Sequence, residues 1–117
     1  MKLLPNAENV VIPIEKFRDY ALNHERKPDK AAAFMDALGY DLSNVQALIN
    51  NLRKNIKNFR AIEKPDNGYG IRYEVMMTLT GINGKKANVL TAWIIDRDTG
   101  KTRLISAYVT KKRLREV

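Results

Sequence analysis

The sequence predicts an α+β fold in which two or three N-terminal helices pack on one face of a C-terminal antiparallel sheet of about four strands. Apolar residues recur at helical spacing over about 13–58, whereas from about 60 to 110 they alternate with a period of two. Short turn signals separate the alternating runs, which favours strands that pair with their neighbours in the chain. A chain of 117 residues is most simply one domain, here with a basic tail at 111–117.

Two helices are expected early in the chain, at 13–22 and 29–38. Pro13 is tolerated in a first helical turn, Asp29 is the expected N-cap of the second helix, and Gly39 is its expected stop. The expected apolar stripes are Ile14, Phe17, Tyr20 and Ala21 in the first helix and Ala33, Phe34, Ala37 and Leu38 in the second. Both stripes should face the sheet.

A third helix is expected from about residue 43 to residue 58. Ser43 and Gln46 have the spacing of a capping box at its start. Its apolar positions are Val45, Leu48, Ile49, Leu52, Ile56 and Phe59, and its opposite side carries Arg53, Lys54, Lys57 and Arg60. We interpret this cationic side as a solvated face.

The remaining residues are expected to form a meander of strands. A weak strand at 59–64 precedes the turn-rich segment PDNGYG, and stronger strands are expected at 71–80, 87–96 and 102–110. The dipeptide Asn83-Gly84 is a hairpin signal between the second and third strands, and the segment RDTGK joins the last two.

Side chains alternate across a strand, so parity assigns them to the two faces of the sheet. The apolar row of the second strand, which should meet the helices, is Ile71, Tyr73, Val75, Met77 and Leu79. In the last strand the expected buried residues are Ile105, Ala107 and Val109, with Leu104, Ser106, Tyr108 and Thr110 facing outward.

The strand at 87–96 is ambiguous because both of its parities are apolar. We place Leu90, Ala92 and Ile94 inside, since small aliphatic side chains pack well under helices. Trp93 then lies on the open face, where an indole with one N–H donor suits a half-wet site. Packing of Trp93 under the edge of a helix is the alternative.

The formal net charge of +8 favours an anionic partner such as nucleic acid, an acidic protein or a membrane surface. The open face would collect Arg72, Glu74, Thr78, Thr91, Trp93, Ser106, Tyr108 and Thr110. This mixture of hydroxyl groups, aromatic rings and cations suits phosphate contacts and base stacking on single-stranded nucleic acid. An ordinary structural explanation also fits, because a half-exposed antiparallel sheet needs a polar face in any case.

Cysteine is absent, which excludes disulfides, thiolate catalysis and cysteine-type zinc sites. This absence suits a reducing cytosol, and it equally suits a protein that passes between compartments without needing oxidation. His24 is the single histidine, and the acidic residues lack metal-ligand spacing, so we expect no metal and no cofactor. No apolar run approaches the roughly 18 residues of a membrane span. The segment MKLLPNAENVVIPIEKF has no signal-peptide core, so we expect neither a signal peptide nor a membrane partner.

Three stretches, DKAAAFMDALGYD, GYGIRYEVMMTLTGINGKKANVLTAWII and RLISAY, resemble a family of small, poorly characterised bacterial and phage domains. Such domains occur alone and at the C-terminal ends of phage head-morphogenesis proteins and polymorphic toxins. The resemblance runs from about Ile12 to Thr110. The family pattern falls on Lys30, Gly70, Arg72, Tyr73, Trp93, Arg103, Ser106 and Tyr108.

The order of helices and strands is also similar to that of the barnase–EndoU–colicin–RelE ribonuclease superfamily, whose members cleave RNA without metal from an open sheet face. The resemblance therefore implies a toxin or effector domain that acts on RNA, either tRNA or single-stranded RNA, in the cytoplasm. It would be delivered as part of a larger phage or toxin polypeptide. An acidic immunity or antitoxin protein would be its second partner.

Metal-free RNA cleavage needs groups that accept and donate protons and cations that stabilise charge on the phosphoryl oxygens. The expected catalytic residues are Lys30 or Arg72 for the phosphate and Tyr108 or His24 for proton transfer. The expected substrate-binding residues are Thr91, Trp93, Arg103, Ser106 and Thr110. His24 falls in a variable loop before Lys30, so the resemblance gives little support to a catalytic role of His24. A solvated surface position is the alternative for Lys30 and for His24.

A non-catalytic module that binds nucleic acid or a phage component through the same face is the alternative function. Glu74 would be a general base or, as the structural alternative, a cross-strand partner for Arg72 or Arg103. An immunity protein is less favoured, because the partner of a basic nuclease should be acidic.

Overall fold

The computed structural model describes residues 2–66 and 68–111. The elements run in the order η1 (Ala7–Asn9), η2 (Phe17–Ala21), α1 (Pro28–Leu38), η3 (Leu42–Asn44), α2 (Val45–Asn55), η4 (Ile56–Asn58), β1 (Ala61–Lys64), β2 (Gly70–Thr80), β3 (Lys86–Asp96) and β4 (Thr102–Thr110). The predicted α+β layout, with helices followed by a four-stranded antiparallel sheet, is confirmed. The basic tail beyond residue 111 lies outside the described residues.

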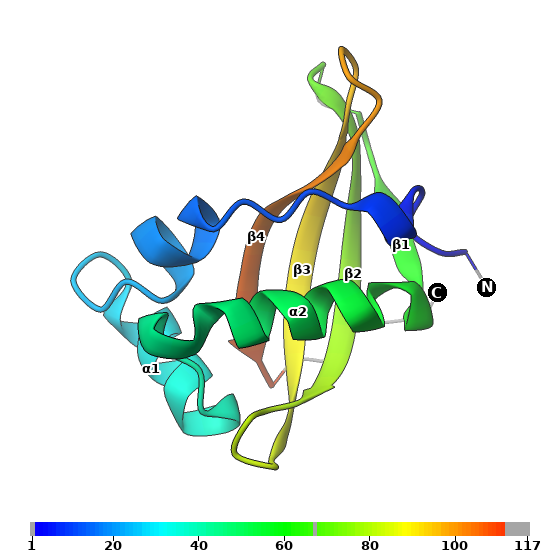
Figure 1. Cartoon of the computed structure of the whole chain (residues 1–117). Helices are drawn as coiled ribbons and strands as arrows, with labels where there is room; N and C mark the ends of the chain where they lie inside the picture. The colour runs from blue at the N-terminus through cyan, green and yellow to red at the C-terminus, as the bar shows by residue number, and fades with distance from the viewer. Residues whose placement is uncertain (1, 67, 112–117) are drawn as a thin grey trace.

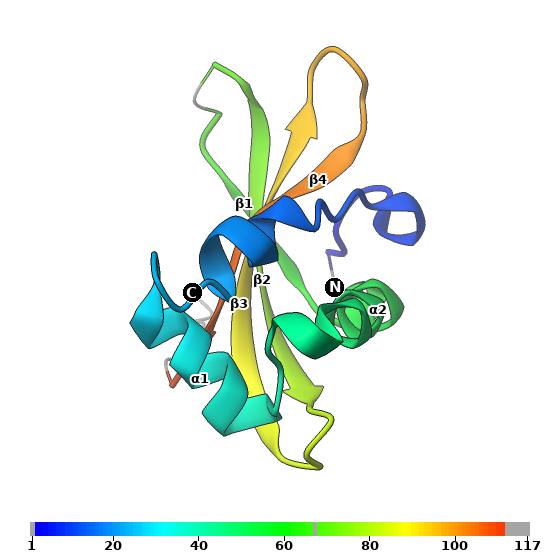
Figure 2. The same cartoon turned by 60° about the vertical axis from the view of Figure 1, so that its left-hand side comes forward.

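The strands follow one another in the order β1-β2-β3-β4, each antiparallel to the next. The helix α2 crosses one face of this sheet, and α1 lies beside β4 (Figures 1 and 2). The segment before η2 runs along the outer edge of β4, where the N–H of Val11 donates to the carbonyl of Thr102 and the N–H of Leu104 donates to the carbonyl of Val11, at 2.8 and 2.9 Å. None of the described helices combines the length and apolar character of a membrane span.

The first predicted helix is shorter than expected. It is reduced to the π-helical turn η2, which buries Phe17 and Ala21. The expected burial of Ile14 and Tyr20 is wrong, since 38% and 47% of their surfaces are exposed. The predicted end of α1 is confirmed, because Gly39 adopts the left-handed conformation, with φ 79°, that closes a helix.

The caps of the two helices differ from the predictions. Asp29 lies inside the first turn of α1, after Pro28, and is not its N-cap. Before α2, the carboxylate of Asp41 accepts from the N–H of Ser43 at 2.8 Å, and the N–H of Asp41 donates to the side chain of Asn44 at 2.9 Å. The predicted box of Ser43 and Gln46 is therefore wrong, because the extra turn η3 moves the capping residues toward the N-terminus.

Removal of the Asp41 cap is expected to lower stability in a pH-dependent way. Hydrogen bonds from the Ser43 hydroxyl and then from the Ser43 N–H hold the pKa of Asp41 below its ordinary value of 3.8. Because the pKa is lower in the folded state, this contribution is present above the unfolded pKa and is lost as the pH falls through the folded pKa. In urea titrations Asp41→Ala should unfold at lower urea than the wild type near neutral pH, and the difference should shrink in acid. Gln46→Ala is the control, and a larger effect of Gln46→Ala at neutral pH would contradict this cap.

The predicted helix-facing row of β2 is buried at Tyr73, Val75, Met77 and Leu79, but the prediction is wrong for Ile71, of which 40% is exposed. The register opposes Tyr73 to Trp93, Val75 to Thr91 and Met77 to Val89. Residues opposite one another in adjacent strands share a face, so the alternate β3 residues from Val89 to Trp93 also face the helices. The prediction that Leu90, Ala92 and Ile94 are the inward row is therefore wrong.

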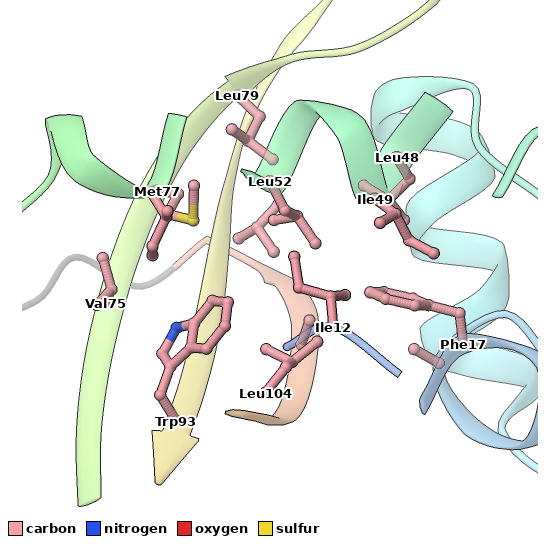
Figure 3. Packing of buried hydrophobic residues seen from close by; sticks show 14 of the residues in the cluster. Ile12, Phe17, Leu48, Ile49, Leu52, Val75, Met77, Leu79, Trp93 and Leu104 are labelled. Carbon is pink, nitrogen blue, oxygen red and sulfur yellow. The ribbon is translucent and has the colours of Figure 1, made fainter. Parts of the chain in front are cut away.

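The polar atoms of Thr91 and Trp93 are satisfied inside the core. The indole Nε1–H of Trp93 donates to Oγ1 of Thr91 at 2.8 Å, and the Thr91 hydroxyl donates to the carbonyl of Val75 at 2.8 Å. Neither residue has exposed surface. Figure 3 shows the indole packed between β2 and the N-terminal segment, near Leu104. Hydrogen bonding within the core removes the penalty that would otherwise keep these groups at the surface.

A β-bulge changes the parity of β4. Ala92 pairs with Ser106, whereas the next residue, Trp93, pairs with Leu104, so Ile105 is the extra residue. Leu104 is fully buried and Ile105 is partly exposed, so the predicted faces of these two residues are wrong.

Candidate functional site

The open face of the sheet, on the side away from α2, carries four rows of side chains. The registers place together Lys64, Arg72, Ile94 and Arg103; Ile62, Glu74, Ala92 and Ser106; Met76, Leu90 and Tyr108; and Thr78, Asn88 and Thr110. Ser106 and Tyr108 are on this face and partly exposed, as predicted. Charged and hydroxyl-bearing residues therefore lie toward both ends of the face, with apolar side chains between them.

A cavity of about 260 Å³ lies between η2, α1 and β4. We call it the lysine pocket. Its lining residues are Lys16, Tyr20, Ala21, Lys27, Lys30, Ile105, Ser106 and Ala107. Lysines from the start of η2 and from the start of α1 thus line one cavity with the middle of the last strand, where Ser106 supplies a hydroxyl group.

Local structure explains why the lysines converge. Lys16 and Lys27 occupy the positions just before η2 and α1, and Lys30 lies in the first turn of α1. Between them, the side chain of Asn23 accepts from the N–H groups of Glu25 and Arg26, both at 3.0 Å. This turn folds the loop between η2 and α1 so that Lys16 and Lys27 both lie beside β4.

Aromatic rings lie beside the lysine pocket. The ammonium nitrogen of Lys30 is 5.3 Å from the centre of the Tyr108 ring, which is within cation–π range. Tyr20 is half exposed, and the guanidinium carbon of Arg26 lies 5.8 Å from the centre of its ring. The predicted residues Lys30, Ser106 and Tyr108 are therefore brought together.

The three lysines of the lysine pocket have no ion-pair partner among the described residues. Between described residues the ion pairs are Lys2–Glu63, Arg18–Asp19, Lys64–Glu74 and Arg97–Asp66. The hydrogen bond from Arg18 also holds the pKa of Asp19 below its usual value, so this carboxylate of η2 stays ionised and paired with Arg18. No described carboxylate is in salt-bridge contact with the three lysines, and an anion in the pocket would be attracted by all of them.

A second cavity, of about 430 Å³, lies on the open face, and we call it the sheet pocket. Its lining residues are Lys64, Pro65, Arg72, Glu74, Ala92, Ile105 and Ser106, and it is bordered by the buried Tyr73 and Trp93. The carboxylate of Glu74 is 2.8 Å from the ammonium nitrogen of Lys64. The expected pairing of Glu74 with Arg72 or Arg103 is therefore replaced by a pair with Lys64.

The remaining predicted site residues lie elsewhere. Thr91 and Trp93 have no exposed surface, so their placement on the open face as ligand contacts is corrected. His24 is exposed and lines neither pocket. Thr110 lines a separate cavity at the far end of the sheet, and Arg103 is partly exposed opposite Ile94.

Sequence reasoning missed Lys16, Tyr20 and Lys27 as pocket residues. The available signal was the spacing of Lys16 and Tyr20, which places them on one side of a helical turn, together with the nearness of Lys27 to Lys30. Among the described residues no three histidine or acidic side chains gather in a metal-ligand arrangement.

Comparison with known proteins identifies one match. A family described as a domain of unknown function, DUF6883, matches residues 3–111. No curated protein and no solved structure matches the chain. The expected resemblance to a small uncharacterised domain family is thereby confirmed, over nearly the same residues.

Proposed function

This chain belongs to the DUF6883 family, and we propose that it is a metal-independent ribonuclease domain that holds an RNA phosphodiester in the lysine pocket. The observation that supports this function is the convergence of Lys16, Lys27 and Lys30 on one cavity next to Ser106. Contacts from lysine to phosphate dominate the affinity of proteins for nucleic acids. The net charge of +8 would also draw a polyanion toward the domain.

The proposed reaction is an attack of the RNA 2′-oxygen on the adjacent phosphorus. The bond from phosphorus to the 5′-oxygen breaks, and a 2′,3′-cyclic phosphate and a 5′-hydroxyl group result. The 2′-hydroxyl loses one proton and the leaving 5′-oxygen gains one, so no proton is consumed overall. Lys30 stabilises negative charge on the phosphoryl oxygens. Tyr108, whose ring lies against Lys30, supplies the hydroxyl group for proton transfer.

The direct test is cleavage of tRNA and of unstructured RNA by the purified protein, with and without a chelator. We expect cleavage that the chelator leaves unchanged, with products that carry 2′,3′-cyclic phosphate ends. RNA that stays intact at every pH where the domain is folded would contradict the ribonuclease function.

A non-catalytic RNA-binding module is the second candidate, and the position of His24 favours it. The single histidine, the commonest acid–base group in enzymes, lies outside the lysine pocket. In that case RNA would remain intact, and its affinity would fall steeply with salt as counterions compete.

Either function would be exercised on RNA in the cytoplasm, after delivery within a larger phage or toxin polypeptide. An acidic immunity or antitoxin protein is the fitting inhibitor, because complementary charge accelerates its association with a basic domain. Coexpression of such an acidic protein should relieve the growth arrest that the ribonuclease would cause.

A further inference from the structure

We propose that the sheet pocket is a second phosphate subsite, so that the preferred ligand is a single-stranded polynucleotide that spans both pockets. The inference rests on the proposed function for the chemical class of ligand. It adds that a mononucleotide fills only the lysine pocket. The affinity for a longer ligand increases when its second phosphate reaches Arg72.

The state of Arg72 is the first observation. Its Nε is a buried donor that has no acceptor among the described residues. Its Nη2 donates to the carbonyl of Pro65 at 3.4 Å, which is at the long limit of a hydrogen bond. An unsatisfied buried donor costs free energy, and an anion that draws the guanidinium group toward the pocket would satisfy it.

The charge around Arg72 is the second observation. The register of β1 and β2 opposes Arg72 directly to Lys64, and like charges in that arrangement repel. Glu74 is in contact with Lys64, so the second positive charge has no carboxylate partner among the described residues. A phosphate would neutralise that charge, and the planar guanidinium group can bind two of its oxygens at once.

The continuity of the two pockets is the third observation. Ile105 and Ser106 line both cavities. The β-bulge lies at this pair, so the two residues separate the lysine pocket beside η2 and α1 from the sheet pocket on the open face. A polynucleotide that passes over the Ser106 hydroxyl group would therefore place one phosphate among the lysines and a neighbouring phosphate at Arg72.

The test uses ligands that cannot be cleaved by attack of a 2′-hydroxyl group. Binding of uridine 3′-monophosphate and of 2′-O-methyl oligouridylates of increasing length is measured by calorimetry or fluorescence at fixed salt. Wild-type affinity should rise about tenfold when a second phosphate is added. Arg72→Ala should remove that gain and leave monophosphate binding unchanged, whereas Lys30→Ala should weaken all ligands.

Two further variants make the outcome decisive. Arg72→Lys keeps the charge but removes the planar donor pair, and it should recover only part of the gain. Lys57→Ala changes an exposed lysine of η4, outside both pockets, and should leave every affinity at the wild-type value. Matched circular dichroism and urea midpoints would show that each variant is folded.

The results separate this inference from the proposed function. A protein that cleaves RNA but binds one phosphate as tightly as several overturns the second subsite alone. The second subsite is also overturned if Arg72→Ala weakens monophosphate binding by the same factor as oligonucleotide binding. If the affinity rises with the length of the oligonucleotide and this rise depends on Arg72, the second subsite is supported even if unmodified RNA is never cleaved.

Discussion

The Trp93→Ala variant is expected to lose about 3–5 kcal/mol of free energy of unfolding, the usual cost of removing a large aromatic side chain from a core. Trp93 is fully buried and is the largest of the fully buried side chains. It lies among the residues that join the sheet to α2 and to the N-terminal segment (Figure 3). Urea denaturation with the wild type and the variant measures the difference.

Two milder variants separate the volume of the indole from its hydrogen bond. Trp93→Phe keeps most of the apolar volume but loses the donor to Thr91, so it should be less destabilised than Trp93→Ala. Thr91→Val removes the acceptor and leaves a buried indole N–H unpaired, at a cost of about 1–3 kcal/mol. If Trp93→Ala kept wild-type stability but lost RNA binding, base stacking by Trp93 would replace the structural role.

Lys30→Ala is expected to reduce RNA cleavage on the order of 100-fold, the usual effect of removing one group that stabilises transition-state charge. Lys30→Ala should weaken RNA binding and so raise KM, but the larger loss should appear in kcat, because Lys16 and Lys27 remain to hold the phosphate. Initial rates over a range of RNA concentrations measure kcat and KM separately. Lys57→Ala, outside the pocket, is the charge-matched control and should cleave at the wild-type rate.

Tyr108→Phe complements this experiment. The substitution keeps the ring beside Lys30 and removes only the hydroxyl group. Cleavage should fall while RNA affinity stays near the wild-type value, because proton transfer is lost and the cations remain. Undiminished cleavage by Tyr108→Phe would assign the proton transfer to another residue.

Sequence periodicity was sufficient to predict the elements whose two sides differ in polarity. In α2 and the turn η4 that follows it, the buried Leu48, Leu52 and Ile56 recur at helical spacing, and in β2 the polar and apolar residues alternate. The face of β3 could not be predicted, because Val89 and Leu90 are equally apolar. Its orientation is decided by pairing with β2, which is a property of the assembled sheet.

The same reason limits prediction of the candidate site. Lys30 and Tyr108 are two of the four predicted catalytic residues, and they are in contact. Lys16 and Lys27 contribute because the loop held by Asn23 folds back toward β4, and that path is not visible in any local pattern. The bulge at Ile105, which brings Ser106 to both pockets, likewise arises from the pairing of β3 with β4.

The contact between Val11 and the edge of β4 joins two segments that are far apart in the sequence. During synthesis on the ribosome the segment around Val11 must wait for β4, since the residues that pair with β4 on both sides are made before it. The cavity that gathers Lys16, Lys27 and Lys30 also needs Ser106 as its wall. A nascent chain that still lacks β4 should therefore have no assembled lysine pocket.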